Sequence, residues 1–281
     1  MKNDYLASGF ADVDKGDDGV FSACLELLDS LPYFQWYKAE TYRLPDLKPG
    51  LCVLDAGCGL GDDCSRICER VSPDGRVVGV DSSRSMVARA RERWGERHGE
   101  LTFDVADARK LRFPTGSFDR CRIDRTLQHV ADPQAAVDEL HRTLKPGGLA
   151  LAYDNDWGTF SISSENVPIT RKVQDQWCYS FTNPWIGRHL GGVFKRAGFE
   201  NVSVHPWLSV LSDFDTADKV YDIGKTLERL VSASRLARRE ADQWIDELRR
   251  QTLEGVFQAT LTAHIVVGRK AADRKRDRSP M

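Results

Sequence analysis

The chain has 281 residues, 41% of them hydrophobic and 29% charged, so it can bury a full core and intrinsic disorder is excluded for most of its length. Its 40 basic and 42 acidic side chains give a formal charge of -2, which argues against a dedicated nucleic-acid binder. The sequence shows no apolar run long enough for a membrane span and no signal peptide. Together with seven scattered cysteines, these features predict a cytoplasmic protein with reduced thiols.

The middle of the chain alternates short apolar runs with amphipathic helices. A first strand at 51–56 passes through a glycine-rich turn into a helix that ends near Val71. Later helices are expected to begin at Ser82 or Ser83 and at Asp132, which precedes a proline. Further strands are predicted at 76–81, 101–105, 118–124, 149–153, 201–207 and 260–267. This alternation predicts parallel βαβ units, whose ligands bind outside the carboxyl ends of the strands.

Three segments do not fit the alternation. Residues 1–48 are expected to form an N-terminal helical cap, and 213–253 a helical insertion before the last strand, acting as a cover or as a lid. The charged residues 272–281 are expected to form a disordered tail. Residues 49–212 and 254–271 then make up the core.

A glycine loop carries the strongest functional signal. Gly57, Gly59 and Gly61 follow the first strand and precede a helix, where glycine allows positive φ and close approach of a ligand. Asp81 ends the second strand, and a carboxylate at that position can accept both hydroxyls of a ribose.

The glycine spacing distinguishes between cofactors. A dinucleotide fingerprint reads G-x-G-x-x-G, whereas this loop reads G-x-G-x-G and has Asp62 where the third glycine would stand. Asp63 adds a second carboxylate, and two negative charges at the start of the helix would repel a pyrophosphate. The loop therefore favours a positively charged nucleoside over NAD.

These motifs resemble those of class I S-adenosylmethionine-dependent methyltransferases, in the subgroup of quinone-biosynthesis and small-molecule enzymes. The resemblance covers residues 50–154 and includes Asp107-Ala108, Phe118-Asp119 and the Lys145-Pro146-Gly147-Gly148 turn, besides the glycine loop and Asp81. It implies a Rossmann-like α/β fold with a doubly wound, seven-stranded, mostly parallel sheet.

The resemblance also implies S-adenosyl-L-methionine as the cofactor and suggests which residues bind it. The candidate cofactor-binding residues are Asp55, Gly57, Gly59, Gly61, Asp81, Ser82, Met86, Asp107, Ala108 and Arg125. Arg125 either pairs with an acidic side chain or reaches the methionine carboxylate of the cofactor. Met86 either packs on the adenine or belongs to the core.

Methyl transfer requires an acceptor held in line behind the methyl group and, for some acceptors, a general base. His129, after the fourth strand, is the first candidate base because imidazole titrates near neutral pH, and His189 is the second. Tyr37, Asp154, Trp157 and Trp185 are candidate substrate-binding residues, because aromatic faces grip a flat or apolar acceptor.

The sequence thus predicts a methyltransferase, monomeric or homodimeric, that modifies O, N or C of a small, largely apolar or aromatic metabolite. A methyltransferase-like protein that uses the bound cofactor for another reaction, such as a cyclisation, is the main alternative. Nucleic-acid methylation and NAD-dependent oxidation are weaker alternatives. No metal is expected, since Cys58, Cys64 and Cys68 have no neighbouring histidine and suit core packing.

Overall fold

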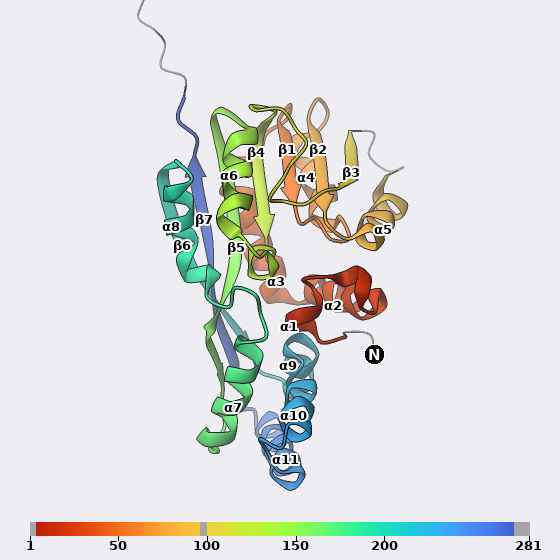
Figure 1. Ribbon diagram of the computed structural model, residues 1–281, viewed down its shortest axis with the longest axis vertical. Coiled ribbons are helices and arrows are strands. Elements are labelled where there is room, and N and C mark those ends of the chain that lie inside the picture. Colours follow the sequence, from red (N-terminus) through yellow and green to blue (C-terminus); the bar gives the residue numbers. More distant parts are fainter. Residues whose placement is uncertain (1–3, 96–99, 273–281) are drawn as a thin grey trace, which may run out of the picture.

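The computed structural model describes residues 4–95 and 100–272 and contains a seven-stranded sheet. Its strand order is β3-β2-β1-β4-β5-β7-β6, and only β7 runs antiparallel to its neighbours β5 and β6 (Figure 1). The mostly parallel sheet predicted from the sequence is therefore confirmed. The strands are β1 Cys52–Ala56, β2 Arg76–Asp81, β3 Leu101–Val105, β4 Phe118–Asp124, β5 Leu144–Ile162, β6 Glu200–Leu211 and β7 Ala259–Arg269.

Helices cover both faces of the parallel part of the sheet. They are α4 Asp62–Val71 and α5 Arg84–Trp94 on one face, and α6 Pro133–Thr143 and α8 Ile186–Arg196 on the other. Val53 of β1 packs in the core formed with α4 and α5, and Leu54 packs in the core formed with α6 and α8. Successive side chains of one strand are therefore buried on opposite faces of the sheet. Cys58, Cys64 and Cys68 are buried in the core that the sheet forms with α4 and α5.

The strand β5 is much longer than the predicted 149–153. Asp154, Asn155 and Asp156 suggested the end of a strand, yet they pair with β7 opposite His264, Ala263 and Thr262. Long β5 and β7 extend the sheet beyond its parallel part, towards α7 Val167–Cys178 (Figure 1). The boundary was mispredicted because the polarity of these residues is satisfied by tertiary hydrogen bonds, which the sequence does not reveal.

The N-terminal helices and the inserted helices share one hydrophobic core. The N-terminal elements are α1 Leu6–Gly9, the short 3-10 helix η1 Val13–Lys15, α2 Asp18–Ser30 and α3 Pro32–Arg43. The inserted helices are α9 Phe214–Tyr221, α10 Ile223–Ser232 and α11 Arg238–Leu253.

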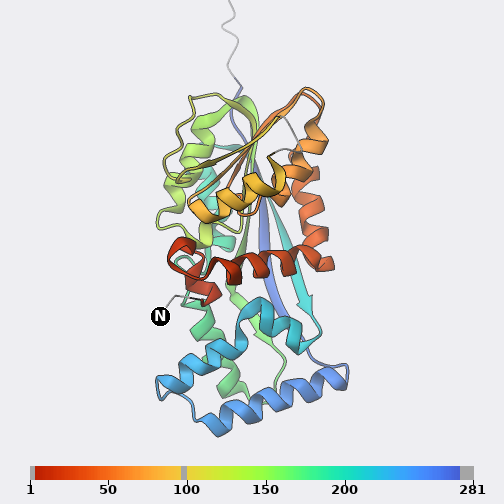
Figure 2. The same cartoon turned by 90° about the vertical axis from the view of Figure 1, so that its right-hand side faces the viewer.

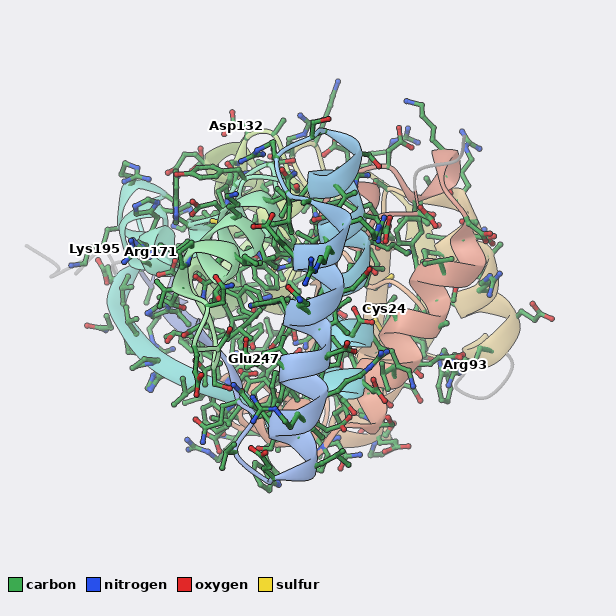
Figure 3. All side chains as sticks on the ribbon, turned by 90° about the horizontal axis from the view of Figure 1, so that it is seen from below. Cys24, Arg93, Asp132, Arg171, Lys195 and Glu247 are labelled. Carbon is green, nitrogen blue, oxygen red and sulfur yellow. The ribbon has the colours of Figure 1, made fainter. Side chains whose placement is uncertain are left out.

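Two hydrogen bonds join these parts of the chain. The Leu6 amide donates to Asp222 Oδ2 at 2.7 Å, and the Tyr5 and Thr226 hydroxyls are 2.9 Å apart. Figure 2 shows α2 between the parallel sheet and α9–α11, and Figure 3, viewed from below, shows α11 with Glu247 crossing this end of the molecule. Cap and insertion thus form one assembly over the end of the sheet.

The predicted tail falls almost entirely outside the described residues, which end at 272. Within 4–95 and 100–272, no helix has the length and apolar character needed to cross a membrane.

Candidate active site

A cavity of about 230 Å³ lies where β1, β2 and β4 end and β5 continues. Its first wall, here called the glycine-loop half, comes from the turns after β1, β2 and β3. This half comprises Gly57, Gly59, Asp81, Ser82, Met86, Ala106, Asp107 and Ala108.

The glycine loop has the backbone that the sequence predicted. Gly57 and Gly59 have φ values of 77° and 52°, in the left-handed region that L side chains rarely adopt. A Cβ at Gly57 would also lie 2.0 Å from Thr126 Oγ1, so no larger residue fits there.

Asp81 retains hydrogen-bonding capacity at the edge of this wall. Its Oδ2 accepts from the Gly59 amide at 3.0 Å and its Oδ1 from the Ser83 amide at 2.9 Å. Burial raises the pKa of its carboxyl group, and these two backbone hydrogen bonds offset part of that increase. A carboxylate has about four lone-pair sites, so Asp81 can still accept hydroxyl groups from a ligand.

The rest of this wall suits a flat ring with polar edges. Met86 is buried and lines the cavity, and Ala106 and Ala108 leave room beside it. Asp107 binds Arg109 at 2.7 Å, but 44% of its side chain stays exposed. The carboxylates of Asp81 and Asp107 and the apolar side chain of Met86 are groups that suit the polar edge and the flat face of an adenosine.

Two predicted cofactor residues, Asp55 and Gly61, lie outside the cavity wall. Asp55 is buried and binds Arg122 Nη1 at 2.9 Å. Gly61 packs against Phe103, whose ring would be 2.6 Å from an added Cβ. Residues 57–60, between them, line the cavity, whereas Asp55 and Gly61 pack against the protein on either side of the loop.

A network of charges lies beside the loop, and its members Lys38, Asp63 and Asp124 also line the cavity. Arg122 of β4 binds Asp55, Asp63 at 2.9 Å and Asp124, and Lys38 of α3 binds Asp63 and Asp124. Burial alone would raise the pKa of Asp63, yet the charges of Arg122 and Lys38 together hold it well below its usual value.

This network corrects part of the electrostatic argument from the sequence. The charge of Asp63 is balanced by Arg122 and Lys38, and Asp62 lies 3.2 Å from Arg93, so the two carboxylates do not act as bare negative charges. The sequence contained one signal of this pairing, the Arg122-x-Asp124 pattern. Alternate residues of a strand lie on the same face, so this pattern predicts that the two charges are neighbours.

The second wall, here called the aromatic half, combines segments far apart in the sequence. It comprises Phe10, Tyr33, Phe34, Tyr37, Tyr153, Trp157, Trp177, Phe181 and Tyr221. Tyr37 stacks on Tyr153 with ring centroids 4.0 Å apart and planes 6° apart, and Trp157 stacks on Phe181 at 4.4 Å. Of the predicted substrate-binding residues, Tyr37 and Trp157 lie in this half.

Gln128 fixes the state of His129, which also lines the cavity. Trp157 Nε1 can only donate, and it lies 2.8 Å from Gln128 Oε1, so the amide oxygen faces Trp157. The Gln128 amide nitrogen then donates to the Arg125 carbonyl and to His129 Nε2, both at 3.1 Å. His129 Nε2 is therefore an acceptor, and in the neutral ring Nδ1 carries the proton.

This arrangement argues against His129 as a general base. Burial, reinforced by the Arg125 charge, lowers the pKa of His129 to about 3, so the ring is neutral at pH 7. Its basic nitrogen is engaged by Gln128, and its Nδ1 is buried with no partner among the described residues. His129 is therefore a neutral imidazole that accepts a hydrogen bond from Gln128 at the edge of the cavity.

Three other predicted residues do not line the cavity. Asp154 is fully buried and accepts the Gln128 and Asn155 amides, and burial raises its pKa to about 8. Trp185 is 37% exposed and packs on Tyr179. His189 is exposed on α8, in a shallow depression near Arg196. The β5 extension and α8 direct these side chains elsewhere, so the structure does not support their predicted roles.

Comparison with known proteins agrees with this geometry. Residues 53–148 match a family model described as a methyltransferase domain. A demethylmenaquinone methyltransferase of Listeria welshimeri is 30% identical over 72% of this chain and 81% of its own length. An uncharacterized 37.1 kDa protein in transposon Tn4556 of Streptomyces fradiae is 37% identical over 82% of this chain, which spans 66% of that relative.

Solved structures share the fold at lower identity. Phosphoethanolamine N-methyltransferase 2 of Haemonchus contortus, in complex with S-adenosyl-L-methionine, has a TM-score of 0.57 and 19% identity, covering 94% of this chain and 59% of its own. The [4+2]-cyclase SpnF has a TM-score of 0.52 and 19% identity, covering 85% and 82%. The chain belongs to the class I S-adenosylmethionine-dependent methyltransferases, in the subgroup that includes the quinone-biosynthesis enzymes. It is an enzyme, and S-adenosyl-L-methionine is its cofactor.

Proposed function

We propose that this methyltransferase modifies a small, largely apolar aromatic metabolite, of the kind that phenols and quinones represent. The observation that carries the proposal is the aromatic half of the cavity, whose stacked Tyr37–Tyr153 and Trp157–Phe181 pairs suit a flat, apolar acceptor. The relatives named as demethylmenaquinone methyltransferases support this class of acceptor.

In this proposal the glycine-loop half holds the cofactor. Asp81 accepts the ribose hydroxyls, Met86 and Ala108 lie along the adenine, and the loop at Gly57 and Gly59 lets the backbone approach closely. When bound, S-adenosyl-L-methionine supplies an electrophilic methyl group on a sulfonium centre. The stacked aromatic side chains orient the acceptor and exclude water, which is the protein's main contribution to methyl transfer.

We also propose that α9–α11 act as a lid. Val220 and Tyr221 of α9 line the cavity, and Asp222 ties this segment to Leu6 of the N-terminal cap. Ordering of the lid by ligands predicts slower amide exchange across 213–253 when S-adenosylhomocysteine and an acceptor are both bound. Unchanged exchange would make the segment a fixed cover.

The proposal is tested with labelled cofactor and a panel of phenols, quinones and amines, followed by mass spectrometry. We expect a labelled product, one methylene heavier than its precursor, from an aromatic hydroxy compound. Trp157→Ala should raise KM for that acceptor while leaving the affinity for S-adenosylhomocysteine unchanged, and the exposed Trp36→Ala serves as the matched control. Methylation restricted to amines or to nucleic acid would overturn the proposal.

The same experiment separates the main alternative, cofactor-dependent catalysis without methyl transfer. The low pKa of His129, which removes it as a general base, and the fold shared with the SpnF cyclase support this alternative. It predicts a product of unchanged mass and no label, from a reaction that still needs the cofactor.

A further inference from the structure

Arg125 is a cation on the cavity wall that has no salt-bridge partner in the described structure. Among residues 4–95 and 100–272, no carboxylate forms an ion pair with its guanidinium and no side-chain hydrogen bond reaches it. Its guanidinium lies over the Phe34 ring, with the guanidinium carbon 5.5 Å from the ring centroid. The neighbouring carboxylate, Asp124, also lines the cavity, and its charge helps to raise the pKa of Arg125 against the effect of burial, but its ion pairs are with Arg122 and Lys38.

The backbone holds Arg125 in an uncommon conformation. Its φ of 50° lies in the left-handed region, where a non-glycine residue needs support from its surroundings. Its amide donates to the Tyr153 carbonyl at 2.8 Å, and its carbonyl accepts from Gln128 Nε2. Hydrogen bonds on both sides therefore fix where this side chain leaves the chain.

The neighbours of Arg125 belong to the aromatic half. Its charge influences the pKa values of Cys24, Tyr33, Tyr37, His129 and Tyr221, and it lowers the pKa of the buried Asp154, which burial raises. Tyr153 of β5 acts on Arg125 in turn.

We propose that Arg125 is the counter-ion of an ionised acceptor, an acidic hydroxy-aromatic or enolic compound bound as its oxyanion in the aromatic half. The inference rests on the proposed function and adds to it the charge state of the acceptor. It assigns Arg125 to the acceptor and not to the methionine carboxylate of the cofactor.

The chemistry follows from the low polarity of the site. A guanidinium surrounded by aromatic rings attracts an anion more strongly than it would in water, and it is always protonated. The acceptor loses its hydroxyl proton to solvent on binding, and the electron pair stays on the oxygen. The nucleophile is therefore prepared without a protein base, which is consistent with the neutral His129.

The test uses 4-nitrophenol, whose phenolate absorbs visible light, with S-adenosylhomocysteine bound to the protein. We expect the bound phenol to titrate about one pH unit or more below the free phenol, which means about tenfold preference for the anion. The neutral analogue 4-nitroanisole should bind correspondingly more weakly. Arg125→Met should abolish the shift, Arg125→Lys should retain most of it, and Arg89→Met, which removes a surface cation, should leave it unchanged.

Calorimetry with S-adenosylhomocysteine verifies that each variant is folded. A tenfold loss of S-adenosylhomocysteine affinity in Arg125→Met, with the phenolate shift retained, would assign Arg125 to the cofactor and overturn the inference. Absence of a shift in the unmodified protein would overturn it as well, even if Arg125→Met failed to fold. The titration needs no turnover, so its failure and failure of the methylation assay are separate results.

Discussion

Replacing Arg122 by methionine should destabilise the protein severely. Arg122 is 4% exposed and, with Lys38, offsets part of the negative charge of Asp55, Asp63 and Asp124. The substitution keeps much of the side-chain volume but leaves three buried carboxylates facing one ammonium group. Removing one partner of a buried ion pair costs about 3–5 kcal/mol, because the remaining charges stay desolvated.

Arg120 provides the matched control on the same face of β4. Its guanidinium binds the backbone carbonyls of Pro45 and Asp119, is only partly buried and pairs with no carboxylate in the described structure. Arg120→Met should therefore cost about 1.5–3 kcal/mol, the usual value for hydrogen bonds that involve a charged group.

Urea unfolding of both variants measures their free energies of unfolding relative to the unmodified protein. The dependence of that free energy on urea concentration should be the same for all three proteins, so that the values can be compared. The pH dependence adds a second criterion. Because the pKa of Asp63 is lowered in the folded protein, its stabilisation is present above about pH 4 and declines as the pH falls. The loss caused by Arg122→Met should therefore shrink in acid. A cost no larger than that of Arg120→Met, or one independent of pH, would refute the reasoning.

Three further predictions concern single side chains. Asp81→Ala should weaken S-adenosylhomocysteine binding by about 1–3 kcal/mol in calorimetry, and unchanged affinity would remove Asp81 from the ribose site. His129→Asn should lower kcat by less than the factor of about 10²–10⁴ expected for loss of a general base, and the pH profile of kcat should show no histidine inflection. A loss of that size, or such an inflection in the unmodified enzyme, would show that His129 is the general base. Asp14 accepts from Ser83 Oγ and the Arg84 amide, and although burial tends to raise it, these bonds lower its pKa to about 2. Asp14→Asn should therefore destabilise the protein at neutral pH but lose this effect as pH falls from about 4 to 2; a constant difference in urea midpoint would contradict this.

The glycine-loop half was predictable because its residues are local in sequence. A strand, a turn that requires positive φ at Gly57 and Gly59, and an acid at the end of the next strand have a fixed relation in a parallel sheet. The resemblance to a methyltransferase family, drawn from these motifs, was confirmed by the relatives.

The aromatic half could not be predicted in the same way. Phe10, Tyr153 and Tyr221 come from an N-terminal turn, a central strand and an inserted helix, and only the packing of these segments brings them to one cavity. Trp185, equally aromatic and close in sequence to Trp177, lies at the surface. Aromatic composition identified the kind of side chain but not its position.

The sequence by itself therefore determined the sheet, the cofactor loop and the acid that ends the second strand, because spacing along one chain segment decides all three. Only the tertiary structure decided which charges are neutralised and which ring nitrogen of His129 carries the proton. Both depend on partners such as Lys38 and Trp157, which are distant in sequence, and in a buried site the nearest partner decides charge and protonation.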